Sequence, residues 1–195
     1  EVEAQSPIER IEIRNGTEVI QTLRGYQSTD LGERIRVVWS GAEYRGRGRT
    51  TFWKGCASFG DASIRKFAKI NAWNLEKKFE VTNNTVTWES VTTGNYGGFD
   101  VWLDTKGDET IDIKTNYGNL SLPISDIGYE DTIMEAGGLE RKIRVFRLPE
   151  INTHKSILET VEIPLSCVGD NPIWVCVTTE DGFQAWSSPI FIFNQ

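Results

Sequence analysis

The chain has 195 residues, which is enough for one large β-domain or two small ones with a buried core. Hydrophobic residues make up 38% and charged residues 25%, a balance typical of a folded protein and not of a disordered one. A formal charge of −7 disfavours nucleic acid and anionic membrane surfaces as partners, because both repel an acidic protein.

The first predicted element is a β-hairpin over residues 8–23 with Asn15-Gly16 at its turn. Asn-Gly is favoured in a two-residue turn because both central positions need a positive φ. Such a turn sets Ile11 opposite Ile20 and places both on the core face together with Ile13.

A half-buried strand is predicted at residues 34–39, where Ile35, Val37 and Trp39 alternate with mostly polar residues. Similar short apolar segments follow at 86–88, 99–104, 111–113, 120–124, 141–148, 157–165, 173–179 and 189–193. About a dozen strands separated by turn signals indicate an antiparallel β-sandwich or barrel. We therefore predict an all-β fold with immunoglobulin-like elements and little or no helix.

Residues 61–79 depart from this pattern. Their apolar residues recur at helical spacing and Asp61 is suited to cap a helix, the apolar positions being Ile64, Phe67, Ala68, Leu75 and Phe79. An extended segment is the alternative, since the other segments are β and Asn83-Asn84 is typical of a turn into the next strand.

The order of the elements suggests two ways of dividing the chain. In the first, residues 1–195 form a single all-β region. In the second, residues 1–32 and 126–195 form an immunoglobulin-like sandwich, and residues 33–125 form a second β-unit inserted between them.

Residue types that usually carry catalysis are scarce. The cysteines Cys56, Cys167 and Cys176 lack the CxxC spacing of a zinc site; Cys176 is interpreted as a core residue, and a Cys167–Cys176 disulfide stays open. The single histidine, His154, lies in a polar stretch without identifiable partners. No GxSxG, HExxH or glycine-rich phosphate loop is present, so we predict no catalytic, metal or cofactor site in this chain.

The most unusual local feature is the run Arg45-Gly46-Arg47-Gly48-Arg49. In an extended chain, Arg45, Arg47 and Arg49 project to one side and the glycines to the other. Three guanidinium groups on one face are suited to docking on an acidic domain or to binding a small anion. A solvated strand or turn is the simpler interpretation.

Two of the seven tryptophans, Trp102 and Trp174, are out of phase with the apolar residues beside them. Their rings are therefore expected to point away from the face that their neighbours form. Packing on a second layer or on another domain is one explanation, and an exposed aromatic platform for sugar rings is another.

The segment from Asp181 to Ile192, DGFQAWSSPIFI, resembles the C-terminal strand pair of a family of uncharacterised, mainly bacterial proteins. These proteins begin with a PHP-like (polymerase and histidinol phosphatase) metal-dependent phosphoesterase domain. The similarity runs from about residue 7 to residue 193 and is also carried by Pro7–Ile13, Trp39-Ser40-Gly41, the arginine run, Trp53-Lys54-Gly55, Asn71–Asn74 and Val101–Asp104.

This resemblance implies a non-catalytic accessory β-region of a larger hydrolase. The family's metal ligands are His and Asp residues of the front domain, so none is carried over to this chain. The implied partner is that catalytic domain in cis. The β-region would pack on this domain or regulate access to it. Whether the protein also forms a homo-oligomer stays open. The resemblance also favours extended structure in 61–79, with a turn near Trp73-Asn74. A carbohydrate-binding module is the alternative function.

Overall fold

The computed structural model describes residues 1–72 and 78–193, and it confirms the all-β class. The described residues contain seventeen β-strands and two short 3-10 helices, η1 (Ser28–Asp30) and η2 (Ile124–Asp126). None of the helices in these ranges is long and apolar enough to span a bilayer. The chain divides into two compact units, which are residues 1–27 with 152–195 (unit 1) and residues 28–151 (unit 2).

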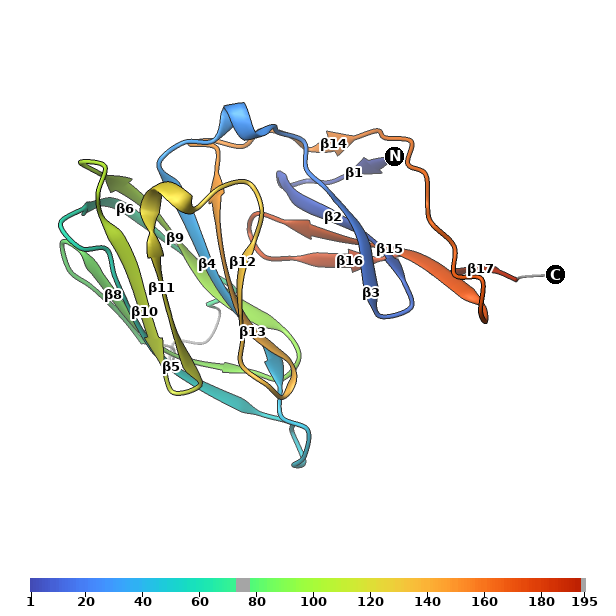
Figure 1. The fold of residues 1–195 in the computed structure, drawn as a ribbon, viewed down its shortest axis with the longest axis horizontal. Coiled ribbons are helices and arrows are strands. Elements are labelled where there is room, and N and C mark those ends of the chain that lie inside the picture. The colour runs from blue at the N-terminus through green and yellow to red at the C-terminus, as the bar shows by residue number, and fades with distance from the viewer. Residues whose placement is uncertain (73–77, 194–195) are drawn as a thin grey trace. The chain divides into compact units, whose positions relative to one another are not determined.

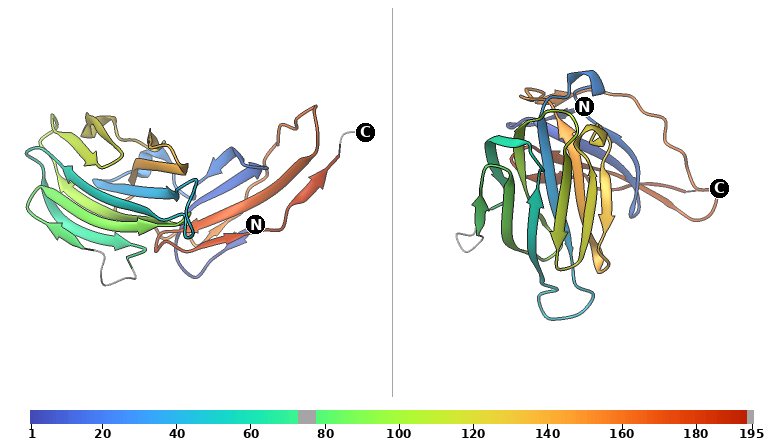
Figure 2. Two further views of the ribbon diagram at one scale, coloured as in Figure 1. Left: turned by 90° about the horizontal axis from the view of Figure 1, so that it is seen from below. Right: turned by 60° about the vertical axis from the view of Figure 1, so that its left-hand side comes forward.

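Unit 2 is a sandwich of two five-stranded antiparallel sheets (Figure 2). One sheet has the order β11-β10-β5-β8-β7, formed by Gly118–Pro123, Thr110–Thr115, Thr51–Ser58, Thr85–Thr92 and Phe79–Val81. The other has the order β12-β13-β4-β9-β6, formed by Thr132–Glu135, Leu139–Leu148, Arg34–Ala42, Tyr96–Asp104 and Ser63–Ile70.

The core of unit 2 lies between these sheets, where the predicted alternation is confirmed. Ile35, Val37 and Trp39 of β4 all point into it and are at most 1% exposed. The indole of Trp39 stacks on that of Trp88 from the facing sheet, with ring centroids 4.8 Å apart. Offset aromatic stacking adds to the burial of two large side chains and fixes the two layers against each other.

A buried ionic cluster lies on the other face of β4 and β9. Arg34 and Arg36 both bind the carboxylate of Asp100, with their closest N···O distances at 2.6 and 2.7 Å. Burial raises the pKa of Asp100, but the charges and hydrogen bonds of Arg36 and Arg34 outweigh it and hold that pKa below its ordinary value of 3.8. Asp100 is therefore the anion that compensates two buried cations.

Unit 1 contains one larger sheet and a small second layer (Figure 1). The sheet has the order β16-β15-β2-β3, formed by Gln184–Trp186, Asn171–Thr179, Ile8–Asn15 and Glu18–Leu23, with β17 (Ile190–Ile192) pairing on β15 beyond β16. The second layer consists of β1 (Val2–Glu3) paired with β14 (Ser156–Ile157). Ile8, Ile11 and Ile157 form a small core between the two layers.

The predicted register of the first hairpin is wrong. Ile11 lies opposite Leu23, not Ile20, because the turn lies one residue later than predicted, which moves the pairing by two residues, and a β-bulge that leaves out Ile20 moves it by one more. The two-residue connection is Gly16-Thr17, and the left-handed φ of +58° falls on Gly16. The strand continues through Asn15 because the Asn15 side chain donates a hydrogen bond to Asn171 of β15, at 2.7 Å.

Two further segments differ from expectation. The helical alternative for 61–79 is wrong for 63–70, which form β6 because their backbone pairs with β9. The turn expected at Trp73-Asn74 lies outside the described residues. The strand expected at 157–165 ends at Ile157, since no neighbouring strand pairs with the residues that follow.

The boundaries between the units also differ from the predicted 32/33 and 125/126. The second of the two predicted divisions places residues 126–151 in the terminal sandwich, whereas β13 pairs with β4 over most of its length and β12 pairs with β13. Both strands therefore belong to unit 2, whose contacts extend to residue 151. Alternating strands alone could not reveal this, because periodicity does not identify a strand's neighbour.

Candidate functional site

The three arginines of the RGRGR run lie in the exposed turn between β4 and β5 (Figure 1). The turn is closed by hydrogen bonds from the Glu43 N–H to the Arg49 carbonyl and from the Arg49 N–H to the Gly46 carbonyl. The run is thus bent and not extended, and the expected single row of guanidinium groups is not formed. Within the described ranges, no ion pair or hydrogen bond engages the side chains of Arg45, Arg47 or Arg49.

Trp102 points away from the sandwich core as expected, but it is only 6% exposed and forms no open platform. The Arg34 guanidinium lies 4.9 Å and the Lys66 Nζ 4.1 Å from its ring centroid. Its indole N–H donates to the Glu150 carbonyl at 3.3 Å. Two cations and a backbone acceptor therefore occupy the surfaces that a sugar would need.

Trp174 is half-buried in β15. Its indole N–H donates to the Gly16 carbonyl at 2.8 Å, and the Arg14 guanidinium lies 5.3 Å from its ring. Trp186 of β16 is 62% exposed. Trp186 pairs with Cys176, so the pleat places Trp174 and Trp186 on the same face of the sheet.

The cysteines and the histidine form no chemical centre. All three cysteines are free, with Cys176 buried as expected and Cys167 exposed, so a Cys167–Cys176 disulfide is not present. No group of three or more His, Cys, Asp or Glu side chains within residues 1–72 and 78–193 is arranged to hold a metal ion. His154 lies exposed in an irregular segment.

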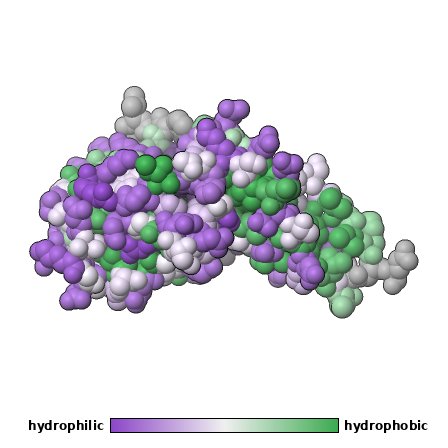
Figure 3. Space-filling model, turned by 90° about the horizontal axis from the view of Figure 1, so that it is seen from above, coloured by the Kyte–Doolittle hydropathy of each residue, from purple (hydrophilic) through white to green (hydrophobic). Residues whose placement is uncertain are grey.

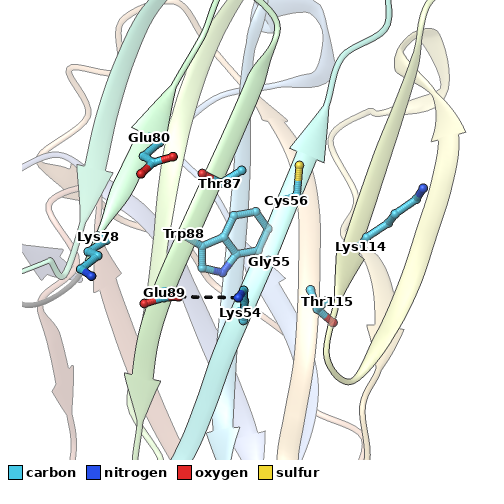
Figure 4. Close-up of a pocket in the computed structure, with 10 residues that line it drawn as sticks. All are labelled: Lys54, Gly55, Cys56, Lys78, Glu80, Thr87, Trp88, Glu89, Lys114 and Thr115. Atoms are coloured by element: carbon cyan, nitrogen blue, oxygen red, sulfur yellow. Dashed lines mark ion pairs between the residues drawn. The ribbon is translucent and has the colours of Figure 1, made fainter.

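A shallow dish of about 510 Å³ lies on the outward face of the β10-β5-β8-β7 side of unit 2 (Figure 4). Its floor is Gly55, beneath which the Trp88 ring packs so closely that a Cβ at residue 55 would lie 2.1 Å from it. Its rim carries Lys54 and Glu89, paired at 3.9 Å but 80% and 54% exposed. Exposed pairs of this kind contribute little, so the Lys54–Glu89 pair does not by itself orient a ligand in the dish.

An apolar depression lies on unit 1. This apolar groove has a volume of about 540 Å³ and is lined by Glu1, Val2, Ile11, Ile13, Leu23, Ile157, Glu159, Val161, Ile163, Ile173, Val175, Val177, Ala185, Trp186, Ser187 and Ile190. Its floor is the inner face of β2 and β15. Carboxylates contribute at one end only, so the groove is suited to an apolar occupant and not to an ionic one.

One wall of the groove is the segment after β14. Alternate residues of this segment, namely Ile157, Glu159, Val161 and Ile163, face the groove as they would in a strand. Yet over the described chain no hydrogen bond joins the backbone of residues 158–165 to another residue. The wall is thus strand-like in pattern but lacks a pairing partner.

The opposite wall continues into a highly exposed apolar surface. Trp186, Ile190, Phe191, Ile192 and Phe193 are 62%, 70%, 53%, 37% and 65% exposed, respectively. Figure 3 shows apolar side chains gathered over this unit. Single exposed apolar residues are ordinary, but a contiguous group of large ones marks an interaction surface.

Sequence reasoning located the motif that builds this wall but not its role. The resemblance falls on DGFQAWSSPIFI, the segment that contains Trp186 and Ile190, but it points to neither as a site residue. A usable signal was the absence of charge from Ser187 to Gln195 in a chain that is 25% charged. Comparisons with protein-family models, with curated proteins and with solved structures found no match.

Proposed function

We propose that this chain is a non-catalytic accessory β-region of a larger PHP-like metal-dependent hydrolase, and that it docks on the rest of that protein through the apolar groove of unit 1. The observation that carries the proposal is the location of the resembling motif. Its residues Trp186 and Ile190 form a wall of the groove and are more than 60% exposed. A surface of this kind is costly to leave in water.

The chemistry of the groove supports a protein occupant. An apolar floor, walls that carry Ile and Val side chains and an unpaired strand-like segment are suited to the side chains and backbone of another domain. A catalytic role for the groove is not favoured, since the Ser187 hydroxyl accepts from the Val175 N–H and no histidine or cysteine is among the described lining residues beside Glu1 and Glu159.

The test uses the full-length protein that contains this chain. Ile190→Asp places a charge in the groove wall, and we expect it to separate the two parts, seen as faster proteolytic cleavage at their junction and loss of a shared thermal transition. Val19→Asp is the matched control, because Val19 is 45% exposed on the opposite edge strand β3. Equal behaviour of both variants and the wild type would count against the proposal.

The arginine turn is a second candidate contact in the same proposal. Arg45, Arg47 and Arg49 are exposed and carry no intramolecular ion pair in the described structure, so they are available to an acidic surface. Replacing the three by alanine in the full-length protein is expected to weaken the contact in a salt-dependent manner. Unchanged stability and activity would remove the turn from the docking surface.

Carbohydrate binding is the second candidate function. It is favoured by the common face of Trp174 and Trp186, where two aromatic rings could support a sugar chain. In this case a glycan array probed with the chain should give binding that Trp186→Ala abolishes. An array without binding would exclude this function for the sugars tested.

A further inference from the structure

Strand β17 is an open apolar edge of the unit 1 sheet. It pairs with β15 on one side, and among the described strands none pairs with its other side. Its residues and Phe193 are uncharged and exposed, whereas the opposite edge strand β3 carries Glu18, Gln21 and Thr22. Charged and polar residues on edge strands prevent edge-to-edge pairing. The sheet is therefore protected at β3 and left open at β17.

The backbone of β17 presents a donor and an acceptor at this edge. Phe191 lies opposite Pro172, which has no N–H, so these two residues cannot exchange the two hydrogen bonds of a bonded antiparallel pair. The Pro172 carbonyl instead accepts from the Gly16 N–H on the side of β2, at 3.0 Å. By the alternation of the ladder, the N–H and C=O of Phe191 point away from β15 towards the open edge.

We infer that β17 pairs antiparallel with β17 of a second copy of this chain, about a two-fold axis at Phe191. Each Phe191 then donates its N–H to the Phe191 carbonyl of the other copy. On either side, the Phe193 N–H reaches the Pro189 carbonyl of the other copy, whereas Pro189 has no N–H to return the second bond, so each flanking pair keeps one hydrogen bond. The two five-stranded sheets become one continuous sheet.

Self-pairing meets what this edge requires of an occupant. A partner strand must be uncharged and must place apolar side chains on both faces, since Ile190 and Ile192 lie on one face and Phe191 on the other. The segment from Ser187 to Phe193 has these properties itself. Phe191 and Phe193 already stack, with centroids 6.2 Å apart, and the two-fold axis would bring both pairs together as one aromatic cluster.

The area involved predicts a reversible dimer and not an obligate one. Four partly exposed side chains per copy bury less than the roughly 1,200–2,000 Å² of a standard interface. The inference is independent of docking in the groove, because Phe191 does not line the groove. A second copy at β17 and another domain in the groove are thus separable by mutation.

Sedimentation velocity of the purified chain tests the inference. The mass should rise from the 22.1 kDa monomer towards the dimer across roughly a hundred-fold range of concentration. Phe191→Lys sets two like charges opposite each other and should weaken association at least about tenfold. Val19→Lys, on the protected edge, should associate as the wild type does. A wild type that stays monomeric, or two variants that behave alike, would overturn the inference.

A crosslink tests the register without relying on a charge. Cα atoms of a bonded antiparallel pair lie about 5.5 Å apart, within the range that a disulfide spans. In a Cys167→Ser background, which removes the exposed native thiol, Phe191→Cys should form a covalent dimer on mild oxidation. Val19→Cys should not. Equal crosslinking at both positions, or none at residue 191, contradicts the two-fold pairing.

Discussion

Replacing Asp100 by asparagine should destabilise unit 2 more than any other single polar substitution on β9. Asp100 is 2% exposed and accepts hydrogen bonds from Arg34 and Arg36, whose side chains are 7% and 1% exposed. Asparagine keeps the shape but removes the negative charge. Two guanidinium groups would then remain buried, side by side and without their shared carboxylate.

The expected loss follows from this arrangement. Removing one partner of a buried ion pair typically costs about 3–5 kcal/mol, because the remaining charge stays out of water. We expect the upper part of that range, since two cations lose one anion. A net stability of roughly 5–15 kcal/mol is typical of a domain, so the variant should remain folded but unfold at markedly lower urea concentration.

Equilibrium urea unfolding followed by tryptophan fluorescence measures this loss, since Trp39, Trp53 and Trp88 are buried in unit 2. The matched control is Asp104→Asn on the same strand. Asp104 is 69% exposed and lies 3.5 Å from Arg65, so its removal should change the free energy of unfolding by less than about 1 kcal/mol. If Asp100→Asn costs no more than the control, the account of the buried cluster is refuted.

Three further outcomes follow from individual contacts. The pKa of Asp100 is lower in the folded than in the unfolded chain. Its stabilising contribution is therefore present above pH ~4 and is lost as pH falls through the folded pKa. As the pH is lowered through this range, the free energies of unfolding of the wild type and Asp100→Asn should converge. Gly55→Ala should cost about 1–3 kcal/mol or more in urea unfolding, because its Cβ would lie 2.1 Å from the Trp88 ring; a neutral effect would show that the ring moves freely. Asn171→Ala removes the acceptor for the Ser166 N–H and the Asn15 side chain. It should lower the free energy of unfolding by about 1–3 kcal/mol and speed proteolysis of residues 158–170. Unchanged cleavage would show that other contacts hold that segment.

The sequence predicted well those features that depend on neighbours along one strand. Ile35, Val37 and Trp39, and likewise Phe99, Val101 and Leu103, reach the core of unit 2 because alternation alone decides which face is buried. The out-of-phase position of Trp102 was also predicted correctly. Whether its ring is packed or exposed stays open from the sequence, since the covering cations Arg34 and Lys66 come from other strands.

Features that depend on distant partners could not be predicted. The hairpin register differs for two reasons: β2 includes Asn15, whose partner Asn171 is 156 residues away in the chain, and a β-bulge leaves out Ile20. The segment 158–165 has a strand pattern but no pairing strand, and a strand requires both. The same reasoning explains why the groove was missed: its walls come from residues 157–163 and 185–190, which only the fold brings together.

Hydrogen exchange in the full-length protein tests the central claim, that another domain covers the apolar groove, most directly. We predict that backbone amides of residues 157–163 and 185–190 exchange more slowly in the full-length protein than in the isolated 195-residue chain. Amides of the edge strand β11, on unit 2, should exchange equally in both. Equal exchange of the groove walls in the two proteins would contradict the claim.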